Sequence, residues 1–266
     1  MVDDGSPAPL DAAVAPFRAD LELTLLRQEN AGPSAARNTG AERARGEFLA
    51  FTDDDCLPEP AWLRELAAVL AADPEAMVGG LTVNAAPNLY STTSQLIVDV
   101  VYRHYNADPR RARFLASNNM AMSRRGFREV GGFDTGLRAA EDRDLCDRWL
   151  HRGGRIVYHP AARIAHVKIL DALGFCRQYF QYGRGARRFS RRRAARASGT
   201  MLAESRFHLD LANWLLYPLS RVPRRRSIAV AALLALWQGA NLAGFLWEGI
   251  RGGSDRSRDG ALSYSG

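Results

Sequence analysis

Apolar residues recur along the first 168 positions with two alternating periods. Short apolar or extended runs, which predict strands, occupy residues 21–26, 47–51, 76–83, 117–123 and 155–160. Segments with helical spacing, or loops that turn into helices, occupy residues 10–17, 32–46, 59–73 and 141–154. Strands and helices that alternate in this way favour an α/β fold, with an open and mostly parallel sheet.

The charge of the chain divides it into two parts. Residues 1–168 carry 20 Lys and Arg against 23 Asp and Glu, a net charge of −3, whereas residues 169–266 carry 16 Arg and no Lys against 6 acidic residues, a net charge of +10. This shift predicts a globular domain over residues 1–168, followed by a basic region over residues 169–266.

The basic region combines arginine with apolar segments. Residues 177–196 contain eight arginines with aromatic residues between them, and residues 227–247 contain no charge over a length that could span a bilayer. This combination indicates a helical, membrane-associated extension that binds an anionic membrane surface. Nucleic acid could also attract arginines and aromatics, but the long uncharged run does not fit that partner.

The cysteines are consistent with a reducing compartment. Cys56, Cys146 and Cys176 are odd in number and far apart, so they predict neither a disulfide framework nor a cysteine metal site. The first residues do not have the basic and apolar pattern of a signal peptide.

Three acidic clusters stand out against the apolar pattern. Asp3-Asp4 and Asp53-Asp54-Asp55 follow apolar residues at predicted strand ends, and Glu141-Asp142 opens a predicted helix. Solvated turns, an Asx turn and a helix N-terminus would each explain one cluster. Three such clusters in an α/β pattern favour a site for a cation and its ligand, because ligands bind beyond the carboxyl ends of the strands.

Five segments, in this order, resemble the motifs of family 2 glycosyltransferases with the GT-A fold. They are VDDGS (2–6), QENAGPSAARNTG (28–40), GEFLAFTDDDC (46–56), ASNNMAMSRRGFREVGGFD (116–134) and EDRDLCDRWLHRGGRIVYHP (141–160). The resemblance covers about residues 1–168. It implies a Rossmann-like sheet flanked by helices, a nucleotide-sugar donor, inverting transfer to an acceptor hydroxyl, and a divalent cation, Mg²⁺ or Mn²⁺.

The resemblance implies roles for the residues on the donor side. Asp53 and Asp55 form the family's D-x-D pattern, in which Asp55 binds the metal and Asp53 or Asp54 reaches the ribose. His166 is similar in placement to a histidine that completes the metal site in some relatives.

Further donor contacts are expected from three motifs. Asp4, with Asp3 beside it, is similar to the carboxylate that binds the nucleotide base. Arg37 and Asn38 begin a helix where phosphate or nucleoside could bind. Asn118 and Asn119 are expected to line the sugar pocket.

The catalytic and acceptor residues are expected in the last two motifs. Asp142 resembles the general base that takes the proton of the acceptor hydroxyl, and Glu141 would orient the acceptor or Asp142. Gly132, Phe133 and Asp134 belong to the segment that resembles the acceptor-side loop.

Two alternatives remain open at this stage. By the same resemblance, the chain starts inside the family's second strand and lacks the first strand and helix, so a non-catalytic remnant that binds a membrane or a partner is one alternative. A processive polysaccharide synthase is the other, disfavoured by the lack of a Gln-x-x-Arg-Trp motif after Asp142. The favoured hypothesis is an enzyme of cell-envelope synthesis at the cytoplasmic face of the membrane, peripheral or with one C-terminal span, acting on a glycan or lipid-linked acceptor.

Overall fold

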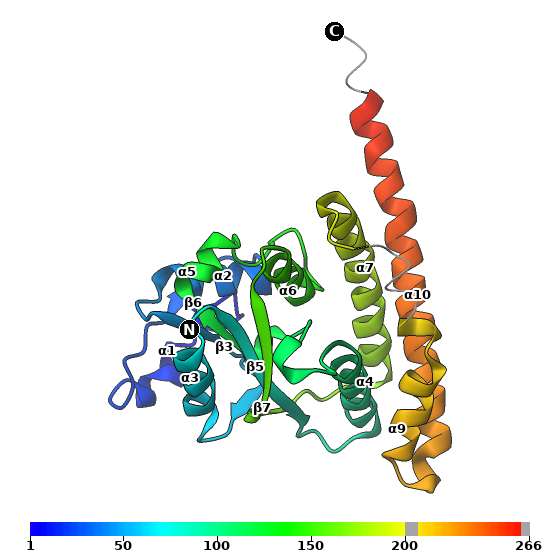
Figure 1. The fold of residues 1–266 in the computed structure, drawn as a ribbon, viewed down its shortest axis with the longest axis horizontal. Helices are drawn as coiled ribbons and strands as arrows, with labels where there is room; N and C mark the ends of the chain where they lie inside the picture. Colours follow the sequence, from blue (N-terminus) through cyan, green and yellow to red (C-terminus); the bar gives the residue numbers. More distant parts are fainter. Residues whose placement is uncertain (200–206, 262–266) are drawn as a thin grey trace.

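The computed structural model describes residues 1–199 and 207–261 as a mixed α/β domain with a helical region beside it (Figure 1). A five-stranded sheet has the order β3-β6-β5-β7-β4, and β1 and β2 form a separate parallel pair. The strands are β1 (Val2–Asp3), β2 (Leu26–Arg27), β3 (Phe48–Phe51), β4 (Cys56–Pro58), β5 (Ala76–Asn84), β6 (Met120–Ser123) and β7 (Arg155–His166).

Helices follow most of the strands and cover the sheet. The α-helices are α1 (Asp11–Val14), α2 (Pro33–Arg43), α3 (Trp62–Ala72), α4 (Leu89–Tyr105), α5 (Arg124–Glu129), α6 (Glu141–His151), α7 (Ala172–Arg196), α9 (Tyr217–Ser220) and α10 (Arg224–Ala261). The shorter helical turns are η1 (Ala15–Phe17), η2 (Pro109–Arg111), η3 (Ser117–Asn119) and the π-helical η4 (Ala212–Leu216).

Two apolar cores hold the helices to the sheet. One core joins β3 and β6 to α5 and α6 and contains Phe51, Met120, Phe127 and Trp149. The other packs α3 against β5 and β7 around Leu66. Burial of these side chains fixes both faces of the sheet and therefore the edge at which the acidic motifs lie.

The prediction of a mixed α/β sheet is confirmed, with three differences of detail. The strand predicted at residues 21–26 is limited to Leu26–Arg27. β7 continues past Pro160 to His166, because the register with β5 shifts there and proline is tolerated at such an irregularity. β6 runs antiparallel to both β3 and β5, and β4 runs antiparallel to β7. Among the described residues the five-stranded sheet therefore has one parallel pair, β5–β7, where the alternating pattern predicted mostly parallel pairs.

The helical region packs on the sheet domain through α4. Leu96, Ile97 and Val100 of α4 share one apolar core with Phe175 of α7 and Trp237 of α10. Figure 1 shows α7 and α10 lying side by side next to α4. The two parts predicted from the charge pattern are thus in contact, and the boundary at residues 168–169 stays a prediction.

Close contact between α7 and α10 depends on glycine. A methyl group on Gly183 would come within 1.9 Å of the Asn241 carbonyl oxygen, and one on Gly244 within 2.0 Å of the Phe180 carbonyl oxygen. The two backbones therefore touch at this crossing, which a larger side chain would prevent.

Residues Arg224–Arg251 of α10 form one helix that is long and apolar enough to cross a membrane, with a mean hydropathy of 1.6. Much of its apolar surface is exposed, most strongly at Ile228 and Ile250. This composition fits the predicted extension, although a core helix of a soluble protein has the same properties.

Candidate functional site

Asp4 organises the loop that leads into α2. Its carboxylate accepts hydrogen bonds from Gln28 Nε2 at 2.7 Å, from the Ala31 amide at 3.0 Å and from the Gly32 amide at 2.8 Å. Desolvation raises the pKa of Asp4, but these hydrogen bonds outweigh it and lower the pKa below its usual value. Asp4 is therefore ionised at the loop where the resemblance expects the nucleotide base.

Asp3 belongs to the local turn. It is 2% exposed, accepts a hydrogen bond from the Ser6 amide and pairs with Arg27 at 3.3 Å. The bonds to Ser6 lower its pKa, so the carboxylate is ionised but committed to the turn. Of the two adjacent aspartates, Asp4 is the more exposed.

Asp55 and His166 meet at the end of β7. Asp55 Oδ2 lies 3.0 Å from His166 Nε2, and the Cys56 thiol completes a group whose ligand atoms all lie within 4.8 Å of one another. Burial, and then the charge of Asp55, raise the pKa of Cys56 to about 11, so the thiol is protonated at neutral pH.

The donor set at this corner suits Mg²⁺ or Mn²⁺. A carboxylate and an imidazole are ligands for such cations, whereas a protonated thiol is a poor one. Asn118 donates to Cys56 Sγ, and its buried Oδ1 has no hydrogen-bond partner among the described residues. Asn118 therefore keeps unused hydrogen-bond capacity beside Cys56.

Arg37 links two of the acidic clusters. Its guanidinium lies 2.6 Å from Asp53 and 3.1 Å from Glu141, and its charge centre is 5.5 Å from the centre of the Phe133 ring. Burial lowers its pKa, but the charges of Asp53 and Glu141 raise it above the usual value, so Arg37 remains charged. The contact joins segments more than 80 residues apart in the sequence.

Asp142 has the electrostatic properties of a general base. Burial, and then the neighbouring charge of Glu141, raise its pKa to about 7, while the Arg143 amide, which donates to Oδ1 at 2.7 Å, opposes the rise. A carboxyl that titrates near neutrality can accept a proton and release it again. Ala140, with φ of 66°, turns the chain just before this residue.

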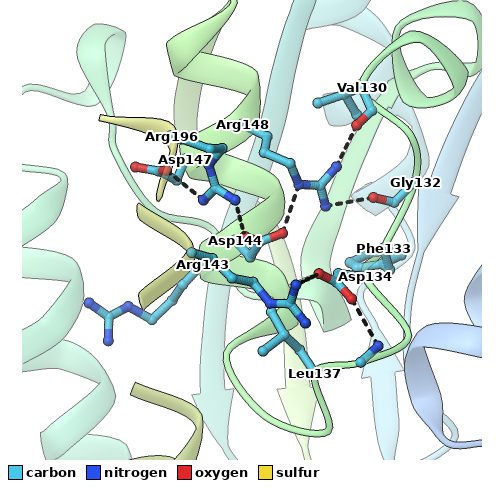
Figure 2. A network of polar contacts seen from close by, with 12 residues as sticks. Val130, Gly132, Phe133, Asp134, Leu137, Arg143, Asp144, Asp147, Arg148 and Arg196 are labelled. Carbon is cyan, nitrogen blue, oxygen red and sulfur yellow. Dashed lines mark hydrogen bonds and ion pairs between the residues drawn. The ribbon is translucent and has the colours of Figure 1, made fainter. Parts of the chain in front are cut away.

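Ion pairs fix the helix that carries Asp142 (Figure 2). The Asp144 side chain is fully buried between Arg148, at 2.7 Å, and Arg196 of α7, at 2.9 Å. Arg148 also donates to the carbonyl oxygens of Val130 and Gly132. One carboxylate thus ties α6 to the loop before it and to α7.

Other arginines of α7 extend this contact. Arg193 and Arg196 pair with Asp147 at 2.9 and 2.8 Å, and Arg192 pairs with Asp134 at 2.9 Å. Arg184 and Arg188 pair with Glu248 of α10. The sequence pattern assigned these five arginines to a membrane surface. In the structure they form ion pairs with carboxylates of the protein itself.

Several predicted site residues hold the surrounding structure in place through buried hydrogen bonds and ring packing. Asn38 bonds the backbone of Phe133 through both ends of its amide, and Asn119, fully buried, bonds Trp62 and two carbonyl oxygens. The Phe133 ring is 2% exposed and packs against Phe51. A ring at that depth offers no surface to an acceptor, so the expected contact of Phe133 with acceptor has no support here.

Gly132 and Asp54 have simpler places. Gly132 has φ of 63°, a conformation that favours glycine in the turn before Asp134. Asp54 is exposed between its two neighbours, where solvent or a ligand can reach it.

Tyr182 of α7 lies within electrostatic reach of Asp142 and Glu141, and the sequence analysis did not single it out. Gly185, one turn later, packs so closely on the loop before α6 that a methyl group there would lie 2.6 Å from the Ala139 carbonyl oxygen. Desolvation and the charges of nearby groups, Asp142 and Glu141 among them, raise the pKa of Tyr182, although its side chain is 47% exposed. Small residues beside tyrosines in α7 were the signal for this close approach.

The fold is that of the GT-A glycosyltransferases. The glycosyl transferase family 2 model matches residues 1–131, and this part of the chain is a family 2 glycosyltransferase domain.

The alignments with curated relatives cover only part of each relative's length. A pre-mycofactocin glycosyltransferase of Mycobacterium tuberculosis is 31% identical over 62% of this chain and 36% of its own length. A glucosyl-dolichyl phosphate glucuronosyltransferase of Haloferax volcanii is 29% identical over 62% of this chain and 58% of its own length. The chain thus spans about a third of the first relative and somewhat over half of the second.

Solved structures share the fold at low sequence identity. A mannosyltransferase of Pyrobaculum calidifontis in complex with GDP-Man and Mn²⁺ has a TM-score of 0.64 at 20% identity, covering 93% of this chain and 76% of that one. GalNAc-T7 with UDP, GalNAc and Mn²⁺ has a TM-score of 0.51 at 18% identity, covering 79% of this chain and 47% of that one.

Proposed function

We propose that the protein is an inverting glycosyltransferase that moves a sugar from a nucleotide-sugar to an acceptor hydroxyl. The observation that carries the proposal is the Arg37 bridge, because it brings the donor-side Asp53 and the catalytic segment Glu141-Asp142 to one place. Family membership and the nucleotide-sugar complexes of the structural neighbours support it.

Asp142 acts as the base. The acceptor oxygen attacks the anomeric carbon on the face opposite the leaving group, and its proton goes to the Asp142 carboxylate. The bond between the anomeric carbon and the phosphate oxygen breaks, and its electron pair leaves with the nucleoside diphosphate. One base is sufficient for a single displacement, and its pKa near 7 matches this role.

Asp55 and His166, with Asp53, would hold the divalent cation. When bound, the cation neutralises the charge that develops on the leaving diphosphate. Asp4 binds the nucleotide base, and Asp53 or the exposed Asp54 reaches the ribose. Arg37 forms ion pairs with two carboxylates, so its role is to position Asp53 and Glu141. It would therefore affect the diphosphate indirectly, through these two residues.

The acceptor enters from the α7 side, where Tyr182 and Asp134 lie. Aromatic rings stack on sugars, so Tyr182 would support the acceptor beside Asp142. A lipid-linked glycan is the proposed acceptor, in cell-envelope synthesis at the cytoplasmic face of the membrane. Exposed apolar residues of α10 and the exposed Arg224, Arg225 and Arg226 support membrane contact.

Metal-dependent nucleotide binding tests the donor side. We expect GDP or UDP to bind the purified chain more tightly with Mn²⁺ than with EDTA, and Asp55→Asn to remove that difference, because it removes a charged metal ligand. Asp20→Asn, at an exposed aspartate before β2, is the control and should behave as the unmodified chain. Unchanged metal dependence in Asp55→Asn would remove Asp55 from the site.

A further inference from the structure

A cavity of about 420 Å³ lies between the sheet domain and the helical region, beside α4 and α9. Its lining includes Thr82, Asp99, Arg103, Tyr158, Tyr217 and Arg221. None of these residues belongs to the donor or catalytic groups described above. The volume lies within the range of small-molecule sites, ~300–1,000 Å³.

Two arginines of the lining lie against the same tyrosine ring. The guanidinium carbons of Arg103 and Arg221 lie 4.7 and 5.2 Å from the centre of the Tyr217 ring. Both side chains are exposed, and in the described part of the chain neither lies within ion-pair distance of a carboxylate. Two guanidinium groups around one ring suit a phosphate, which they can bind with paired hydrogen bonds.

The rest of the lining offers groups for hydroxyls. Thr82 is 6% exposed, and its Oγ1 has no hydrogen-bond partner among residues 1–199 and 207–261. Asp99 accepts one bond from Gln95 at 2.9 Å and keeps further acceptor capacity. Burial, and then the charge of Asp99, raise the pKa of Tyr158, so these two side chains are neighbours.

We propose that this cavity binds a glycosyl phosphate at a second site, separate from the nucleotide-sugar site. The phosphate lies at Arg103 and Arg221, the sugar hydroxyls bond Asp99 and Thr82, and the ring lies against Tyr158. An inorganic anion would use only the arginines and would leave the buried Thr82 hydroxyl unpaired. The same chemistry is offered by a free sugar phosphate and by the phosphate-linked sugar of a lipid headgroup.

Calorimetry on the full chain in EDTA tests the site, because EDTA removes the proposed metal-dependent donor binding. We expect glucose 1-phosphate to bind more tightly than inorganic phosphate, glucose or a nucleoside monophosphate. Equal or tighter binding of any of these comparators would overturn the proposal, as would the lack of glucose 1-phosphate binding.

Three variants assign the binding to the cavity. Arg221→Ala should weaken glucose 1-phosphate binding at least about ten-fold, the usual scale for a lost charged hydrogen bond. Thr82→Val should weaken it several-fold while the melting temperature stays equal or rises, because the variant removes a hydroxyl that is unpaired in the free protein. Arg225→Ala, at an exposed arginine of α10, should bind normally. Unchanged binding in Arg221→Ala and Thr82→Val would overturn the proposal.

Vesicles distinguish the two sources of the ligand. The chain is bound to vesicles of phosphatidylcholine with phosphatidylinositol, whose headgroup is a hydroxylated ring on a phosphate, and glucose 1-phosphate is then added. Release of the wild type, with little initial binding by Arg221→Ala, identifies a lipid headgroup as ligand. If neither added glucose 1-phosphate nor Arg221→Ala changes vesicle binding, while calorimetry shows glucose 1-phosphate binding, the ligand is a free sugar phosphate.

Discussion

At the scale of residues, the properties of Asp142 come from its neighbours. Burial and Glu141 raise its pKa to about 7, and Arg37 and Arg143 act in the opposite direction. A base with a raised pKa is protonated, and inactive, on the acid side of that value. Turnover should therefore rise with pH through neutrality.

Glu141→Gln tests this electrostatic account. Removal of a like charge should lower the pKa of Asp142, so the acid limb of the kcat profile should move to lower pH, while burial keeps the pKa above its usual value. The profile is measured alongside Glu129→Gln, which changes an exposed glutamate of α5 and should leave the limb in place. An unshifted limb in Glu141→Gln would mean that another group sets it.

At the scale of elements, α7 joins the catalytic domain to α10. It contacts α6 through buried ion pairs and α10 through Gly183, where the two backbones touch. Tyr182 directly precedes Gly183, and its ring centre lies 5.6 Å from that of Tyr179.

A matched pair of glycine substitutions separates contact from helix propensity. Gly183→Ala should lower the free energy of unfolding by ~1–3 kcal/mol, because its methyl group collides with the Asn241 carbonyl oxygen. A methyl group on Gly239 would meet open space, so Gly239→Ala should raise the free energy of unfolding by ~0.5–1 kcal/mol. Chemical denaturation measures both, and a similar change in the two variants would contradict the close crossing.

The sequence pattern predicted some elements much better than others. β3 and α3 have clear periodicity and lie where expected, since burial of alternate or helically spaced residues leaves few other arrangements. The strand expected at residues 21–26 is mostly absent, because apolar spacing does not show whether a partner strand is available.

Candidate site residues could be named from the sequence where a single motif contains the chemically reactive side chain. Asp55, Asp142 and His166 lie where motif resemblance placed ligands or base, and their roles stay predictions. Phe133 and Asn119 lie in the core instead, because neighbours in a motif can point to opposite sides of the chain. The arginines of α7 were assigned to a membrane, since their carboxylate partners lie far away in the sequence.

At the scale of the whole molecule, the exposed face of α10 sets how the enzyme would meet a membrane. Ile228, Leu242 and Ile250 are each more than half exposed along one helix, and Arg224–Arg226 lie at its start. Apolar burial resists salt, whereas attraction of arginine to anionic headgroups does not.

Flotation with vesicles separates the apolar contribution to membrane binding from the contribution of the arginines. Replacing Arg224, Arg225 and Arg226 by Ala should weaken binding to anionic vesicles by about 1 kcal/mol for each arginine. Binding to uncharged vesicles should remain. Arg192→Ala is the comparison, because that arginine pairs with Asp134 and should contribute little to vesicle binding. Lack of binding to any vesicle would contradict membrane association.

Release of nucleoside diphosphate from GDP- and UDP-sugars by the purified chain is the most direct test of the central claim. With Mn²⁺ and a lipid-linked or glycan acceptor, we expect release from at least one donor, and we expect Asp142→Asn to lower it by at least about two orders of magnitude with donor binding retained. Equal release by Asp142→Asn, or donor binding without release from any donor by the unmodified chain, would contradict the account, and the second result would favour a non-catalytic protein.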